Sequence, residues 1–147
     1  MKVQYSVGII LLMFVAFSSC LKRGLDELPT FSDTKIDRFD FEYRWNDNGT
    51  FRVVRFNTNS TIENDNITVT TTVPAASGSF TSQVRNEITL SNIVGMCNIS
   101  TAATIKPVDG APELGVPGNY SKNVSYEVTA ADGRTKKRWN VVVNLIK

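Results

Sequence analysis

The chain has 147 residues, a formal net charge of +2 and no histidine. The absence of histidine excludes catalytic triads built on an imidazole and the ordinary zinc sites, and the near-neutral charge gives no reason to expect a nucleic-acid partner. Only carboxylates, lysines and tyrosines are left for catalysis, and the acidic residues stand singly along the sequence. We therefore expect a protein that is not an enzyme and that uses no metal or cofactor.

The chain opens with MKVQYSVGIILLMFVAFSSC, which has the layout of a secretory signal peptide. Its apolar run is shorter than the roughly 20 residues that a spanning helix needs, so a retained transmembrane anchor is the weaker alternative. The end of the segment, FSSC, resembles the bacterial lipobox, whose cysteine is acylated. We expect residues 1–19 to be removed and Cys20 to hold the protein at a membrane, the outer membrane, on its periplasmic or cell-surface face.

Two further regions follow the predicted anchor. Residues 20–34 contain Gly24 and Pro29 and show no strand periodicity, which indicates a lipidated N-terminus and a flexible tether. Residues 35–147 are rich in Thr, Val and Ile, with turn-forming residues at short intervals and no convincing amphipathic helix. This pattern predicts one all-β domain, an antiparallel β-sandwich of about seven strands.

The first predicted hairpin has the clearest pattern. Four aromatic residues alternate with charged ones in KIDRFDFEYRW, namely Phe39, Phe41, Tyr43 and Trp45. The sequence NDNG predicts a tight turn, and TFRVVRFN returns as the partner strand. We expect the aromatic row to face the core, with the charged residues, Glu42 among them, on the water side. Trp45 lies next to the turn and is expected to reach the surface, so Trp45 and Tyr43 are the tentative ligand contacts, through stacking on sugar rings.

The middle of the chain predicts shorter elements. A polar loop is expected at NSTIENDN and a flexible connection at AASGS. Strands are expected at ITVTTTVP, NEITLSN, CNISTAATIKP, SYEVTA and RWNVVVNLI. Cys97 lies in an apolar context that predicts a small buried hydrophobe rather than a reactive thiol. The stretches NDNG and ENDN lack the ligand spacing of a known calcium loop, so we expect polar turns there.

The last predicted hairpin carries a cluster of basic residues. In SYEVTAADGRTKKRWNVVVN, Asp132 and Gly133 suit a turn that needs positive φ, and Lys136, Lys137 and Arg138 follow it. Alternate residues at a hairpin tip and strand start face water, and lysines at sheet edges commonly block edge pairing. We expect a solvated turn, with the binding of an acidic glycan or of lipid headgroups as the alternative.

Three of these stretches resemble one family. KIDRFDFEY, ITVTTTVP and above all NVSYEVTAADGRTKKRWNVVV are similar to the immunoglobulin-like or cadherin-like β-sandwich modules of Bacteroidetes envelope lipoproteins. The resemblance implies an immunoglobulin-like sandwich that works beside polysaccharide-utilisation or surface-adhesion machinery. Two functions fit this company. The first is an accessory module that binds a glycan or another extracellular ligand, and the second is a structural subunit that contacts an envelope protein through a sheet edge or face.

Overall fold

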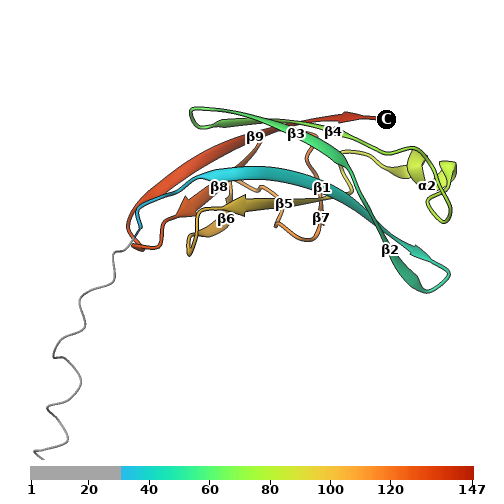
Figure 1. Ribbon diagram of the computed structural model, residues 1–147, viewed down its shortest axis with the longest axis horizontal. Helices are drawn as coiled ribbons and strands as arrows, with labels where there is room; N and C mark the ends of the chain where they lie inside the picture. Colours follow the sequence, from blue (N-terminus) through green and yellow to red (C-terminus); the bar gives the residue numbers. More distant parts are fainter. Residues whose placement is uncertain (1–30) are drawn as a thin grey trace, which may run out of the picture. The chain divides into compact units, whose positions relative to one another are not determined.

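Two β-sheets packed against each other form the part of the chain that the computed structural model describes, residues 31–147 (Figure 1). The four-stranded sheet has the order β2-β1-β5-β7, and the five-stranded sheet has the order β3-β4-β9-β8-β6. The strands in chain order are β1 Ile36–Asp47, β2 Thr50–Arg55, β3 Asn57–Glu63, β4 Asn66–Thr72, β5 Ile93–Ile99, β6 Thr104–Val108, β7 Pro117–Gly118, β8 Val124–Thr129 and β9 Lys136–Ile146. One short helix, α2 Ser82–Glu87, links β4 to β5. The predicted signal peptide and Cys20 lie outside the described residues.

The all-β sandwich that the sequence predicts is confirmed. Most neighbouring strands run antiparallel, as in β1 with β5 and β8 with β9. The exception is the pair of β4 and β9, which run parallel from Asn66 opposite Asn140 to Thr72 opposite Ile146. The five-stranded sheet is therefore mixed. Among residues 31–147, no helix has the length and apolar character needed to cross a membrane.

The aromatic row of β1 supplies much of the core, as the alternation predicts. Phe39 and Phe41 are fully buried, and Tyr43 is nearly so. The ring of Phe39 packs against Tyr126 of β8, with ring centroids 5.8 Å apart, and Phe41 meets the edge of Tyr120 at 4.9 Å. Each buried aromatic ring stabilises the fold by about 1.5–3 kcal/mol relative to an exposed one.

The prediction of a polar loop at NSTIENDN is wrong for most of that stretch. Strand β3 covers Asn57–Glu63 and pairs with β4 along its whole length. The sequence does not indicate this strand, because it forms an edge of the five-stranded sheet, where most of its side chains are exposed and no apolar alternation is needed. The tight turn after it contains Asn64 at φ 54°.

Two predicted strands in the middle of the chain also differ from the structure. NEITLSN is not a strand: it begins with the last residues of α2, whose first turn is capped by the Thr81 hydroxyl accepting a hydrogen bond from the Val84 amide. CNISTAATIKP is two strands, β5 and β6, separated by a turn in which Ala102 has a φ of 59°. Six-residue helices and non-glycine residues at positive φ leave little periodic signal in a sequence.

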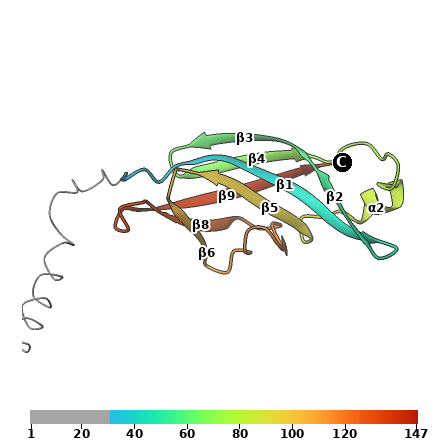
Figure 2. The same cartoon turned by 60° about the horizontal axis from the view of Figure 1, so that its bottom comes forward.

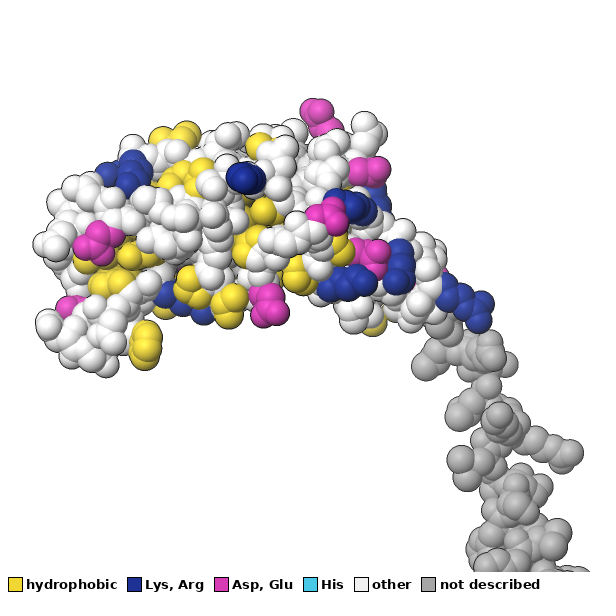
Figure 3. Space-filling view, turned by 180° about the vertical axis from the view of Figure 1, so that it is seen from behind, with side chains coloured by type: hydrophobic (Ala, Val, Ile, Leu, Met, Phe, Trp, Pro, Cys, Tyr) yellow, Lys and Arg dark blue, Asp and Glu magenta, His cyan; other side chains and the backbone are white. Residues whose placement is uncertain are grey.

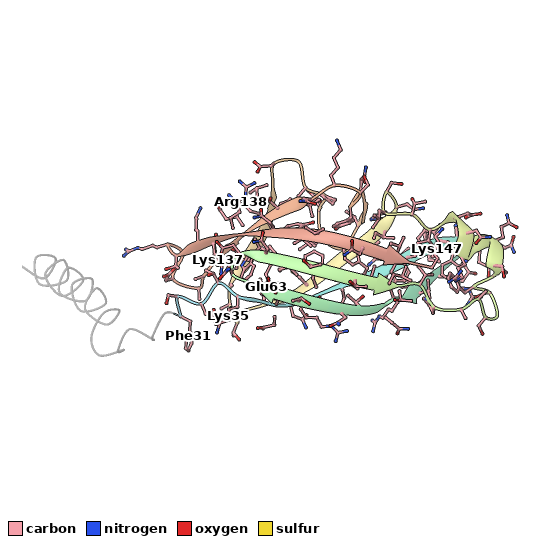
Figure 4. All side chains as sticks on the ribbon, turned by 90° about the horizontal axis from the view of Figure 1, so that it is seen from above. Phe31, Lys35, Glu63, Lys137, Arg138 and Lys147 are labelled. Carbon is pink, nitrogen blue, oxygen red and sulfur yellow. The ribbon has the colours of Figure 1, made fainter. Side chains whose placement is uncertain are left out.

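The start of the domain is fastened to its neighbours. The indole Nε1 of Trp139 donates a hydrogen bond to the Thr34 carbonyl at 2.9 Å, and the Lys35 amide donates to Ser100 Oγ at 2.9 Å. Phe31, Lys35 and Lys137 lie at one end of the domain, and Lys147 lies at the other (Figure 4).

Candidate functional site

The hairpin of β1 and β2 is where the sequence places its candidate contacts. Its turn has Asn48 at φ 50° and Gly49 at φ 87°, the two positive values of a type I′ turn, one of the favoured two-residue hairpin turns. Asp47 is therefore opposite Thr50, and Trp45 is opposite Arg52. The turn end of the hairpin projects beyond the neighbouring strands (Figures 1 and 2).

The inner side of the hairpin holds both predicted contact residues. The rings of Trp45 and Tyr43 lie nearly parallel, with an interplanar angle of 11° and centroids 6.2 Å apart. Trp45 also packs against Phe80, at 5.6 Å between ring centroids. Tyr43 is buried, and this burial raises the pKa of its phenol. The structure thus brings the two residues together, but Trp45 is half-buried and only part of its ring is open to a ligand.

The outer side of the hairpin presents a more exposed aromatic ring, that of Phe51. Its side chain is 83% exposed, and Val53, two residues further along β2, is 53% exposed. Phe51 is directly opposite Asn46, and Val53 is opposite Arg44, so amide and guanidinium groups flank this apolar pair. The aromatic alternation of β1 did not point to Phe51, although the register set by the NDNG turn places it on the face opposite Trp45.

Glu42 lies on this outer side, but it is buried. The prediction that it faces water is therefore wrong. Its side chain is 6% exposed, and Arg44 covers it with a nitrogen to oxygen distance of 2.6 Å. The same guanidinium donates a hydrogen bond to the Gly115 carbonyl at 2.7 Å, in the loop before β7. A second guanidinium, that of Arg55, is 4.0 Å from Glu42. Burying a carboxylate is tolerated where it is paired, and the pairing holds Arg44 in place next to Val53.

A hollow of about 200 Å³ lies further along β1 and β2. Its polar lining consists of Arg38, Asp40 and Arg55, with Met96 beside them. Arg38 and Asp40 form an ion pair at 2.7 Å, whereas the Arg55 side chain is 84% exposed. The outer side therefore offers a ring, a hollow and planar hydrogen-bond donors along one pair of strands.

Hydrophobic side chains reach the surface elsewhere only in small groups on the face drawn in Figure 3, where polar and charged side chains separate them. A large protein interface usually needs a continuous apolar core. On that face the surface does not provide one.

The basic residues of the last hairpin are engaged in local pairs. Lys136 contacts Glu127 at 3.2 Å, Lys137 contacts Asp65 at 3.1 Å, and Arg138 pairs with Asp109. The Lys137 ammonium also lies over the Trp139 ring, 3.9 Å from its centroid. These contacts fit the expected turn and strand start better than a free cationic site.

Two smaller expectations can be placed in the structure. Cys97 is half-buried, and this burial raises the pKa of its thiol to about 11, so little reactive thiolate is present near neutral pH. Among residues 31–147, no three His, Cys, Asp or Glu side chains are grouped to hold a metal ion.

Comparison with known proteins identifies the family of this chain and two solved structures similar to it. The family model described as DUF5018-related matches residues 36–142, and the chain belongs to that family. A solved structure of a Bacteroides fragilis protein inferred to be secreted shares 36% identity over 81% of this chain and 100% of its own, with a TM-score of 0.72. A Bacteroides thetaiotaomicron protein inferred to be a glycoside hydrolase shares 22% identity over 84% of this chain and 28% of its own, with a TM-score of 0.50, which shows a shared fold alone. No curated protein matches.

Proposed function

We propose that the protein is a non-catalytic accessory module of the bacterial cell envelope, anchored by a lipid on Cys20, that binds an extracellular glycan with the outer side of the β1–β2 hairpin. The observation that carries the proposal is the exposed ring of Phe51, flanked by the amide of Asn46 and close to the fixed guanidinium of Arg44.

The chemistry of this surface suits a sugar. An exposed aromatic ring offers a flat apolar face on which the C–H face of a pyranose can stack. Amide and guanidinium groups supply several hydrogen-bond donors in fixed planes, which match ring hydroxyls. Because Arg44 is already held by Glu42 and Gly115, little side-chain entropy is lost when it contacts a ligand.

The similar proteins are in keeping with this role. One is inferred to be secreted, and the other, of which this chain spans only about a quarter, is inferred to be a glycoside hydrolase. A domain of this fold can thus occur inside a larger chain named for carbohydrate chemistry. These similarities support glycan binding by association, whereas the exposed ring of Phe51 supports it on physical grounds.

Affinity electrophoresis of the purified protein through gels that contain a panel of plant and host polysaccharides tests the proposal. We expect at least one polysaccharide to retard the wild-type protein and Phe51→Ala to abolish most of that retardation. Trp45→Ala is the matched comparison, because Trp45 lies on the inner side of the same hairpin.

The outcomes separate the two sides of the hairpin. Retardation lost in Phe51→Ala and kept in Trp45→Ala supports the outer side. The reverse pattern supports the contacts predicted from the sequence, Trp45 and Tyr43. Retardation of the wild-type protein by no polysaccharide contradicts glycan binding.

A further inference from the structure

Strand β2 is the least protected edge of the two sheets. Of the four edge strands in the described residues, β6 contains Lys106 and Pro107, β7 has only two residues and begins with Pro117, and the sequence of β3 is mostly polar. Strand β2 reads TFRVVR and contains no proline, glycine or lysine. Proteins commonly use proline, lysine and short length to stop an edge strand from pairing. Strand β2 has none of these three devices, and its only charged residues are Arg52 and Arg55.

The free edge of β2 belongs to the same residues that point outward. In a two-residue hairpin, Asp47 and Thr50 exchange hydrogen bonds, and every second residue of β2 then bonds to β1. The Phe56 amide donates to the Phe41 carbonyl at 3.0 Å, which fits this alternation. Phe51, Val53 and Arg55 therefore direct their own amide and carbonyl groups away from β1, while their side chains stand on the outer side of the sheet.

This edge is complementary to itself. When two antiparallel copies of β2 meet about a two-fold axis at Val53, each Phe51 is opposite Arg55 of the other copy, and the two Val53 side chains are opposite each other. An arginine beside an aromatic ring is a favourable pair, and no like charges are directly opposite. One neighbouring register places Arg52 opposite Arg52, which is unfavourable. The other places Arg55 opposite Val53 and loses the pair of arginine and aromatic ring.

We infer that the protein forms a symmetric homodimer through antiparallel pairing of β2 with β2, in the register that places Val53 opposite Val53. The two four-stranded sheets become one continuous sheet, and the outer sides of both hairpins lie next to each other on it. A ligand with repeating units could then contact both copies, which would strengthen binding without new contacts in either copy.

The expected dimer is weak. The contact consists of three residue pairs with main-chain hydrogen bonds and a few side chains, which is below the size of a stable interface of about 1,200 Å² or more. Anchoring to a membrane would concentrate the protein and favour such a contact. The dimer is therefore best detected by trapping it.

Disulfide trapping tests the register directly. The Cα atoms of a hydrogen-bonded antiparallel pair are about 5.5 Å apart, within the range of a disulfide. Oxidation of Val53→Cys should give a covalent dimer on non-reducing gels. Phe51→Cys is the matched control, because its two copies would be offset by four residues, about 14 Å along the strands. Both variants keep the native cysteines, so a crosslink through Cys97 would appear in both.

The dimer is supported by a several-fold larger trapped fraction in Val53→Cys than in Phe51→Cys. Equal trapping in the two variants, or none at protein concentrations up to about 1 mM, would overturn it. Sedimentation velocity gives an independent readout: Val53→Thr should keep the concentration dependence of the wild-type protein, and Val53→Lys should lose it. Neither measurement uses a glycan, so failure of the dimer and failure of glycan binding are distinguishable.

Discussion

At the scale of single residues, Gly95 of β5 shows how closely the core is packed around Tyr120, which lies between β7 and β8. A Cβ at this position would lie 2.3 Å from Tyr120 Oη and 2.8 Å from its Cζ, and Tyr120 is 1% exposed. We predict that Gly95→Ala lowers the free energy of unfolding by about 1–3 kcal/mol, because the Tyr120 ring has to move against Phe41.

Urea denaturation measures this change. Asn98→Ala, an exposed position on the same strand, is the control and should stay within about 0.5 kcal/mol of the wild-type protein. A Gly95→Ala protein as stable as the control would show that the Tyr120 site has spare room.

At the scale of elements, the turn between β8 and β9 depends on one carboxylate. Asp132 accepts hydrogen bonds from the Thr135 hydroxyl and from the Thr135 and Arg134 amides, and these bonds lower its pKa. A lowered pKa in the folded state means that the stabilisation is present at neutral pH and is lost as the pH falls through that pKa. We predict that Asp132→Asn destabilises the protein at pH 7 and that the difference shrinks below about pH 4. Urea denaturation of the wild-type protein and of Asp132→Asn, at pH 7 and below about pH 4, measures this difference in stability. A difference that does not change with pH would contradict the prediction.

The elements also show which parts of the fold a sequence can predict. The β1–β2 and β8–β9 hairpins were predictable, because each combines alternating apolar residues with a turn that contains glycine at positive φ. Strand β3 was not, because an edge strand needs no apolar face. The burial of Glu42 was not predictable either, since it depends on Arg44 reaching Gly115, which lies 71 positions away in the sequence. For the candidate site, the sequence pointed to the β1–β2 hairpin, and its turn register could also have identified Phe51.

At the scale of the whole molecule, the predicted lipid anchor, Cys20, comes before the folded domain in the sequence. We predict that Cys20→Ser moves the protein from the membrane fraction to the soluble fraction, because no acyl chain can then be attached. Cys97→Ser is the control and should remain with the membranes, since Cys97 belongs to β5. Fractionation and immunoblotting of whole cells measure both. Membrane association of Cys20→Ser would show that something other than this cysteine holds the protein.

The outer side of the β1–β2 hairpin is the center of the proposed function, and an NMR titration tests it most directly. The isotope-labelled protein would be titrated with oligosaccharide fragments of the polysaccharides in the panel. We predict chemical-shift changes concentrated at Arg44, Asn46, Phe51 and Val53. Changes confined to residues outside this hairpin, or no changes at millimolar oligosaccharide, would contradict it.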